Sequence, residues 1–178
     1  MRSLSPFDTL TCSVHITPAS PADAAAIAAV RVAAADRLTR DFGDGHWSAH
    51  ANEASVLRDM KASRVLAMRA RDRIVGTLTL QTRKPWAIDA LYFTPCKKPL
   101  YLINMAVAPE HQRLGIGRAL LDEALTVARS FPADAIRLDA YEDPAGAGPF
   151  YRKCGYTHVG GATYRGVPLL YFELMTGA

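Results

Sequence analysis

Two glycines stand at the start of a helical pattern, directly after an apolar run. Gly115 and Gly117 lie within segment 102–121, LINMAVAPEHQRLGIGRALL. The first amides of a helix lack intrahelical acceptors and sit at the positive end of its dipole. Glycine lets this backbone approach a phosphate closely, and Arg113 and Arg118 add cationic donors. The segment therefore predicts a pyrophosphate-binding turn made by Gln112, Arg113, Leu114, Gly115, Ile116, Gly117 and Arg118.

Other readings of these glycines are weighed by what surrounds them. Gly-x-Gly alone also occurs in an ordinary strand-to-helix turn. A dinucleotide fingerprint needs a third small residue where Leu120 stands, which disfavours nicotinamide cofactors. A nucleoside triphosphate loop needs Gly-Lys-Ser/Thr, and the chain has none.

Two sequence runs together resemble one known family. The run VAPEHQRLGIG, 107–117, resembles the central motif of the GNAT superfamily of N-acetyltransferases, whose amides hold the coenzyme A pyrophosphate. The run AGPFYRKCGY, 147–156, resembles the second motif of that family, on a short helix before a strand. The two runs occur in the family's order and at about its separation, and with the flanking residues they cover 100–160. The preceding helices and hairpin also fit the family's order.

The resemblance implies an acetyl-CoA-dependent N-acetyltransferase that acts on a primary amine by direct attack. Acetyl-CoA would be the cosubstrate, with its pantetheine arm held at the splayed strand by Met105, Ala106 and Val107. Tyr151 is the expected general acid, because a phenol can protonate a departing thiolate; packing under its helix is the other reading. Pro144 stands where the family often has Asn, and Asp143 is a candidate to replace that contact.

The acceptor site and the general base are less defined. Segment 41–47, DFGDGHW, lies where the family lines its acceptor site; Asp41 and Asp44 would attract a cationic amine and Trp47 would stack on it. The family often has a Glu near position 103 or 104, and here Asn104 can only orient a water. The remaining base candidates are Glu142, Asp89, His46 and His111, with a water chain as another route.

The elements that must position these residues follow from hydrophobic periodicity. The fold class is mixed α/β, and the resemblance implies a central, mostly antiparallel twisted sheet with a splayed parallel pair, flanked by helices. Strand 102–107 should part from strand 136–140. The expected strands are 14–17, 64–70, 74–81, 100–107, 136–141, 156–159 and 168–174, and the expected helices 21–40, 52–62, 115–130 and 145–153.

Composition bounds the remaining possibilities. The 178 residues, 21% charged and 49% hydrophobic, predict one domain at 12–178 after a loose leader, residues 1–11. The absence of a signal pattern or long apolar run predicts a cytoplasmic protein without a membrane partner. The net charge of +4 comes without a basic stripe, which disfavours nucleic acid. Three scattered cysteines predict reduced thiols and no metal site.

Three functions remain open from the sequence. The first is an N-acetyltransferase of a small amine, the second acetylates a protein lysine or N-terminus, and the third is a non-catalytic acyl-CoA-binding module. Tyr151 favours an enzyme over a binding module. The oligomeric state is left open, with a homodimer among the options, as are the acceptor and the acyl-chain length.

Overall fold

The computed structural model describes residues 14–142 and 144–177, and its strands form one seven-stranded sheet. The order across the sheet is β1-β2-β3-β4-β5-β7-β6, with β4 and β5 parallel and the other neighbours antiparallel. This confirms the expected mixed sheet. The expected leader, residues 1–11, and Asp143 lie outside the described residues. The strands are β1 (Val14–Pro18), β2 (Arg64–Ala70), β3 (Arg73–Gln81), β4 (Pro99–Val107), β5 (Ala135–Tyr141), β6 (Thr157–Tyr164) and β7 (Val167–Met175).

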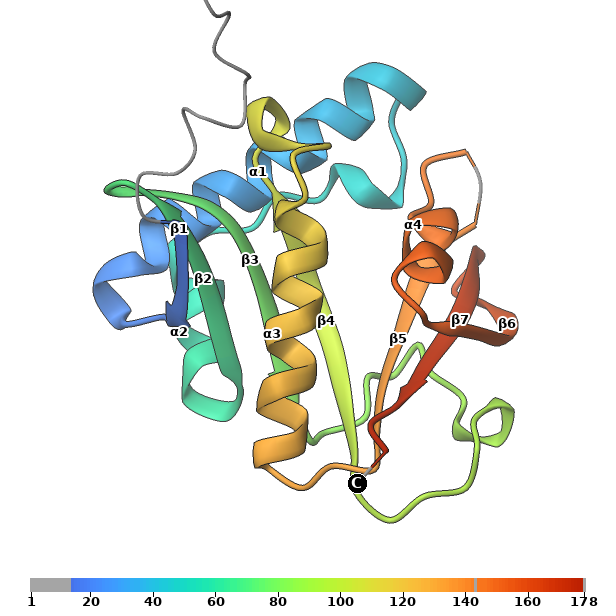
Figure 1. Cartoon of the computed structure of the whole chain (residues 1–178). Helices are drawn as coiled ribbons and strands as arrows, with labels where there is room; N and C mark the ends of the chain where they lie inside the picture. Colours follow the sequence, from blue (N-terminus) through green and yellow to red (C-terminus); the bar gives the residue numbers. More distant parts are fainter. Residues whose placement is uncertain (1–13, 143, 178) are drawn as a thin grey trace, which may run out of the picture.

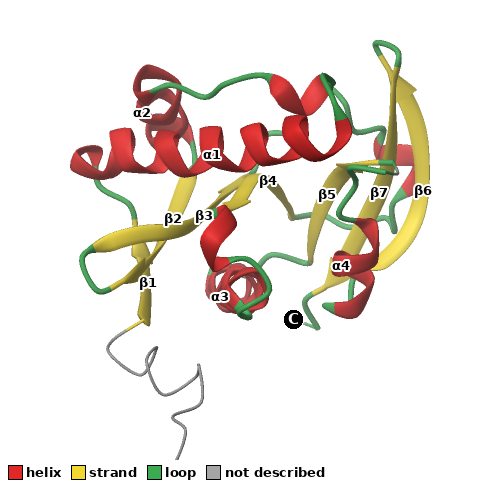
Figure 2. Ribbon diagram, turned by 90° about the horizontal axis from the view of Figure 1, so that it is seen from above, coloured by secondary structure: helices red, strands yellow, loops and turns green. Residues whose placement is uncertain are grey.

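Helices cover both faces of this sheet (Figure 2). α1 (Ala24–Phe42) and α2 (Glu53–Ala62) lie on one face, and α3 (Ile116–Ser130) and α4 (Gly148–Lys153) on the other. Within residues 14–142 and 144–177, no helix is both long and apolar enough to span a membrane. The 3₁₀ turns are η1 (Pro21–Asp23), η2 (His46–Ser48), η3 (Ala90–Tyr92) and η4 (Pro109–His111).

Local signals explain where the helices begin. The backbone amide of Ser20 donates to the Asp23 carboxylate at 2.7 Å, before η1 and α1. Asn52 caps α2 by accepting from the Ser55 amide at 2.9 Å. α4 begins at Gly148, whereas the sequence predicted a start near 145. Proline is tolerated in the first turn of a helix but not in its interior, so Pro149 sets the start of α4.

The sequence prediction also ended β6 too early. The strand was expected at 156–159 but runs to Tyr164, through Gly160 and Gly161. A Cβ added to Gly160 would collide with the Tyr92 ring, and one added to Gly161 would collide with the Leu169 carbonyl. These glycines permit close packing on the strand rather than ending it.

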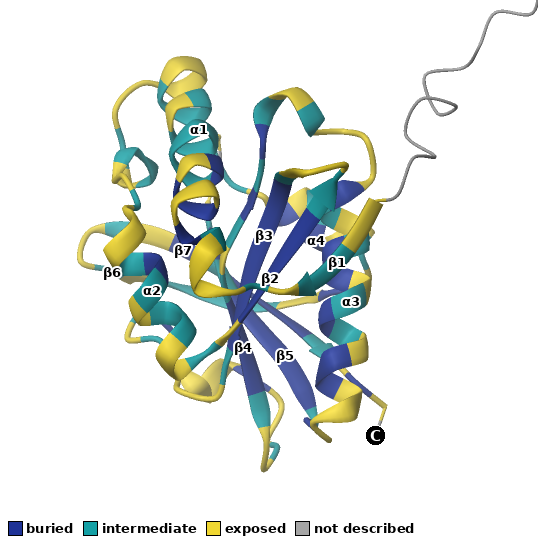
Figure 3. Ribbon diagram, turned by 90° about the vertical axis from the view of Figure 1, so that its left-hand side faces the viewer, coloured by how far each residue is buried: buried dark blue, intermediate teal, exposed yellow. Residues whose placement is uncertain are grey.

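The main core lies between α3 and the sheet. The helix buries one face, as its periodicity predicts, with Ile116, Leu120, Leu121, Ala124, Val127 and Ala128 inside. Figure 3 shows the central strands buried along most of their length. The strand that precedes α3 and the helix itself are therefore held rigidly, and the turn between them has a fixed position.

β4 and β5 are paired over a short stretch and then part. Their parallel register covers Pro99–Tyr101 against Ala135–Arg137. Beyond it the strands diverge, leaving a V-shaped opening toward the upper end of the sheet in Figure 1. The predicted splay of these two strands is confirmed. Its open end lies beside the start of α3.

A buried ion pair lies near the closed end of this V. Arg137 on β5 donates through Nε to the Glu173 carboxylate on β7 at 2.9 Å, and both side chains are almost fully buried. The same guanidinium donates to the Thr94 carbonyl and contacts the Cys96 thiol. The pair thus attaches the β3–β4 connection to the C-terminal half of the sheet.

We predict that breaking this pair destabilises the fold strongly. In Glu173→Leu the buried Arg137 charge loses its partner, and the free energy of unfolding should fall by about 3–5 kcal/mol. The double variant Arg137→Met/Glu173→Leu removes both charges and should recover most of that loss. Urea denaturation of the three proteins measures the effect. A double variant no more stable than the single one would contradict this account.

Candidate active site

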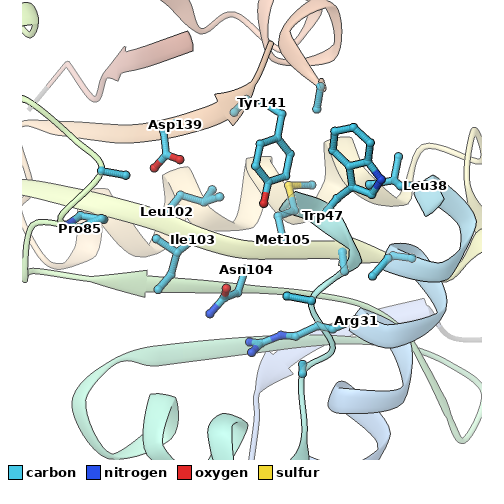
Figure 4. Close-up of a pocket in the computed structure, with 18 of the residues that line it drawn as sticks. Arg31, Leu38, Trp47, Pro85, Leu102, Ile103, Asn104, Met105, Asp139 and Tyr141 are labelled. Carbon is cyan, nitrogen blue, oxygen red and sulfur yellow. The ribbon is translucent and has the colours of Figure 1, made fainter. Parts of the chain in front are cut away.

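The opening between β4 and β5 leads into a cavity of about 830 Å³. Its walls come from α1, the α1–α2 connection, the β3–β4 connection, β4, β5 and the start of α4 (Figure 4). Residues from both strands face it, including Leu102 to Ala106 of β4 and Asp139 to Tyr141 of β5. The cavity therefore occupies the place where a continuous sheet would have had its central hydrogen bonds.

The turn before α3 presents unpaired backbone donors. The Ala119 amide donates to the Gly115 carbonyl at 3.0 Å, whereas the amides of residues 113–118 have no acceptor within the described chain. Gly115 has φ +83 and Arg113 has φ +62, both in the left-handed region. No heavy atom lies within 4 Å of a Cβ built on Gly115. The backbone here is an open row of donors, a geometry that suits phosphate oxygens.

Gly117 has a different role from Gly115. A Cβ added to Gly117 would lie 3.0 Å from the Phe150 ring and 3.4 Å from the Met105 methyl. The missing side chain lets α3 approach α4 and β4 closely. Gln112 fixes the other end of the turn, because its amide donates to the Val107 carbonyl at 3.1 Å. Arg118 donates to the Lys153 carbonyl at 3.2 Å and joins α3 to the end of α4.

Tyr151 on α4 is buried and lines the cavity. Its hydroxyl donates to the Met105 sulfur at 3.8 Å, a weak contact, and no stronger acceptor is found among the described residues. Burial, and then the nearby negative charge of Asp139, raises the pKa of Tyr151 well above its usual value. The hydroxyl therefore stays protonated at neutral pH and is free to donate to a group entering the cavity.

A polar network fixes the irregular part of β4. β3 and β4 slip in register between Thr77 and Thr79, where β4 carries an extra residue, and Asn104 has φ +53. Asn is among the residues that tolerate this conformation best. The Asn104 amide donates to the Asp59 carboxylate of α2 at 3.0 Å. Arg31 of α1 donates to the same oxygen at 2.9 Å and to Thr79 at 3.1 Å, so the Asp59 charge is balanced.

Asp139 on β5 is the carboxylate without such a partner. Figure 4 shows its side chain pointing from β5 into the cavity, above Leu102. It has no hydrogen bond or ion pair to another residue in the described part of the chain, and its own backbone amide is its only donor. Burial raises the pKa of this carboxyl. An unpaired, desolvated carboxylate favours binding of a cation and is a stronger base than an exposed one.

Trp47 and Tyr141 close one side of the cavity (Figure 4). Their rings meet edge to face with centroids 5.8 Å apart. The Tyr141 hydroxyl donates to the His46 carbonyl at 3.2 Å, and the Trp47 indole donates to the Gly43 carbonyl at 3.1 Å. The α1–α2 connection is therefore held against β5 across the opening.

The residues predicted from the sequence fall into three groups. Trp47, Asn104, Met105, Ala106 and Tyr151 line the cavity. Val107 and residues 112–118 lie at the turn beside it. Asp41 pairs with Arg37 at 2.6 Å, and neither Asp41, Asp44 nor Glu142 is among the cavity's lining residues.

The other candidate bases lie apart from the cavity. Asp89 accepts from the Leu91 amide at 3.0 Å as the cap of η3. His111 lies 3.7 Å from Glu110, and His46 contributes its carbonyl to Tyr141. The described residues contain no cluster of three or more His, Cys, Asp or Glu suited to a metal ion. Cys96 and Cys154 are free thiols, as predicted.

A sequence comparison decides the family. The model of the acetyltransferase (GNAT) family matches residues 31–156, more than half of the chain. The chain belongs to the GNAT acetyltransferase family. Its transferase class follows from that membership, and the matched range includes both motifs identified in the sequence.

Solved structures of similar fold agree with this assignment. The acetyltransferase resembles PaiA N-acetyltransferase from Thermoplasma acidophilum, solved with coenzyme A, at 16% identity and TM-score 0.70, covering 92% of this chain and 99% of that one. It resembles the ribosomal-protein-S18-alanine N-acetyltransferase of Escherichia coli at 16% identity and TM-score 0.70, covering 92% and 94%. YncA of Salmonella typhimurium, solved with acetyl-CoA, gives 18% identity and TM-score 0.68, covering 92% and 94%.

Sequence reasoning missed several residues that line the acetyltransferase cavity. They include Arg31, Asp59, Trp86, Asp139, Tyr141 and Tyr164. A signal for Asp139 was present: strand alternation places it on the same face as Arg137 and Tyr141, in a strand expected to border the cofactor. The other residues come from distant segments that only the tertiary fold brings together.

The raised pKa of Asp139 predicts a pH-dependent stability difference. Ionisation of this carboxyl disfavours the folded protein; the penalty appears as pH rises above the unfolded value of about 3.9 and is complete above the folded pKa. Asp139→Asn should therefore raise the free energy of unfolding at pH 7, with the difference shrinking toward pH 4. Urea denaturation across this range measures it, and Asp72→Asn, at an exposed turn position, is the control. An Asp139→Asn variant that is no more stable than wild type at pH 7 would contradict the assignment.

Proposed function

We propose that the protein transfers the acetyl group of acetyl-CoA to the primary amine of a small molecule. The observation that carries this proposal is the slot between β4 and β5. It runs from unpaired amides at the start of α3 to a cavity that contains the Tyr151 hydroxyl and the unpaired Asp139 carboxylate. An acyl transfer needs a site for an anionic carrier, a proton donor and an amine site in this arrangement.

The residues present fit coenzyme A. The amides of residues 113–118 and the open space at Gly115 suit the pyrophosphate. Met105, Ala106 and Val107 would hold the pantetheine arm, because the backbone of β4 has no strand partner there on the β5 side. When bound, acetyl-CoA supplies the acetyl group as a thioester.

Asp139 is assigned to the amine. Its carboxylate attracts an ammonium group and receives the proton that must leave before the nitrogen can attack. Burial favours this transfer because it raises the basicity of the carboxylate. The nitrogen–carbon bond then forms as the carbon–sulfur bond breaks, and the surplus proton passes through Asp139 to water.

Tyr151 is assigned to the leaving sulfur. Its hydroxyl is protonated, lines the cavity and is engaged only by the Met105 thioether within the described residues. The burial that raises its pKa would also raise the pKa of a thiol formed beside it, so a proton can pass between them. Tyr151 recovers its proton from solvent.

The alternative acceptor is a protein lysine or N-terminus, and the alternative activity is acyl-CoA binding alone. The link from the Tyr141 hydroxyl to the His46 carbonyl narrows the opening and favours a small acceptor. A bare binding module has no need for an unpaired buried carboxylate. Thiol release from acetyl-CoA, assayed with small amines and with lysine and N-terminal peptides, tests the proposal. Thiol release that no amine stimulates would overturn it.

We predict that a carboxylate at position 115 blocks coenzyme A. In Gly115→Glu the new side chain enters the open space before α3, repels the pyrophosphate and strains a left-handed residue. Affinity for coenzyme A should fall roughly ten- to hundredfold, the equivalent of one lost charge-assisted contact. Gly166→Glu is the matched control, because Gly166 has φ +81 and equally open surroundings in the β6–β7 turn. Calorimetric titration of the folded variants separates lost binding from shared strain; equal affinities would exclude the turn.

Tyr151→Phe should reduce turnover without weakening cofactor binding. It removes the proton donor but keeps the ring, so kcat should fall roughly ten- to ten-thousandfold while affinity for coenzyme A stays the same. Tyr156→Phe is the control, because that hydroxyl is buried without a partner in the described chain and does not line the cavity. Wild-type turnover by the Tyr151→Phe variant, at matched folded concentration, would remove Tyr151 from the mechanism.

A further inference from the structure

We infer that the preferred acceptor is a primary amine carried on an aromatic body without an acidic group. The ammonium would lie at Asp139, and the ring between the Trp47–Tyr141 side of the cavity and the opposite side formed by Trp86 and Tyr164. This inference rests on the proposed function and names the substrate class of the same site.

The charge of the cavity is the first argument. Its ionisable acid, base and histidine side chains are Arg31, His50, Asp59 and Asp139. Arg31 pairs with Asp59 at 2.9 Å, and His50 contacts Asp36 at 2.8 Å. Asp139 is left as the single carboxylate without a counter-charge among these residues. The cavity therefore favours one positive charge, and it offers no unpaired cation to balance a carboxylate on the acceptor.

The aromatic side near Asp139 is the second argument. Tyr141 lies two residues after Asp139 on β5, so both side chains point to the same face of the strand (Figure 4). Trp47 packs edge to face on Tyr141 and, at 6.5 Å, on Phe42. The polar atoms of both rings are used by backbone carbonyls. The surface they present to the cavity is thus apolar and held in place before a ligand binds.

The opposite side supplies a second aromatic surface. Trp86 is 78% exposed at the edge of the cavity, and Tyr164 of the β6–β7 hairpin also lines it. Exposure of a large indole in a monomer is unusual unless a ligand covers it. Between the two sides the lining residues are small: Ala34, Ala35, Ala49, Ala51 and Ala87. The space they leave is wide enough for a ring rather than only a linear chain.

The test compares four acceptors by thiol release from acetyl-CoA: 2-phenylethylamine, n-butylamine, phenylalanine and a five-residue peptide with a free N-terminus. The first two are simple alkylamines that differ in the ring, and phenylalanine adds a carboxylate beside the amine. We expect kcat/KM for 2-phenylethylamine to exceed that for n-butylamine by about tenfold or more, as burial of a ring allows. Phenylalanine should be used at least about tenfold less well than 2-phenylethylamine.

Variants assign the preference to the aromatic sides. Trp47→Ala should reduce the ratio of kcat/KM for 2-phenylethylamine over n-butylamine toward one, with unchanged affinity for coenzyme A. Phe131→Ala removes an exposed ring at the far end of α3 and should leave the ratio unchanged. Equal use of 2-phenylethylamine and n-butylamine, or a preference for phenylalanine or the peptide, would overturn the inference while acetyl transfer stands. Absence of transfer to every amine would instead remove the proposed function, and the inference with it.

Discussion

The parting of β4 and β5 is the constraint on which the rest of the molecule depends. A central pair of strands normally satisfies its backbone groups along its whole length, because buried amides and carbonyls without partners are costly. Here the pairing stops after Tyr101, so the groups beyond it need water or a ligand. The cavity, the turn before α3 and the position of Asp139 all follow from that single interruption.

Two sets of polar contacts hold the parted strands in place from opposite ends. At the closed end, Arg137 and Glu173 join β5 to β7 and to the β3–β4 connection. At the open end, Arg31 and Asp59 bind Asn104, which keeps the irregular stretch of β4 turned away from β5. Hydrophobic packing alone would favour closing the gap. The polar contacts give each strand a partner other than its neighbour.

Local patterns in the sequence were enough to predict the parts of the site made by contiguous residues. The glycines before α3 and the Phe-Tyr pair on α4 act within short segments, so spacing and periodicity identify them. The start of α4 was misplaced because the effect of Pro149 was not applied, and β6 was cut short because its glycines look like breakers until Tyr92 is seen against them. Asp139 could not be singled out, because its distinction is the absence of a partner. Asp41 looked equally free in the sequence but is paired with Arg37.

The divergence of β4 and β5 also bears on how the protein avoids self-association. An unpaired strand edge normally invites another chain to add a strand. Here the two unpaired edges face each other inside one molecule, with α1 packed on β4 from one side and α3 contacting both strands from the other. A second polypeptide cannot lie flat along either edge. The sheet therefore keeps a row of unsatisfied amides and carbonyls available to a slender amide-bearing ligand, at a place where strand addition is sterically excluded.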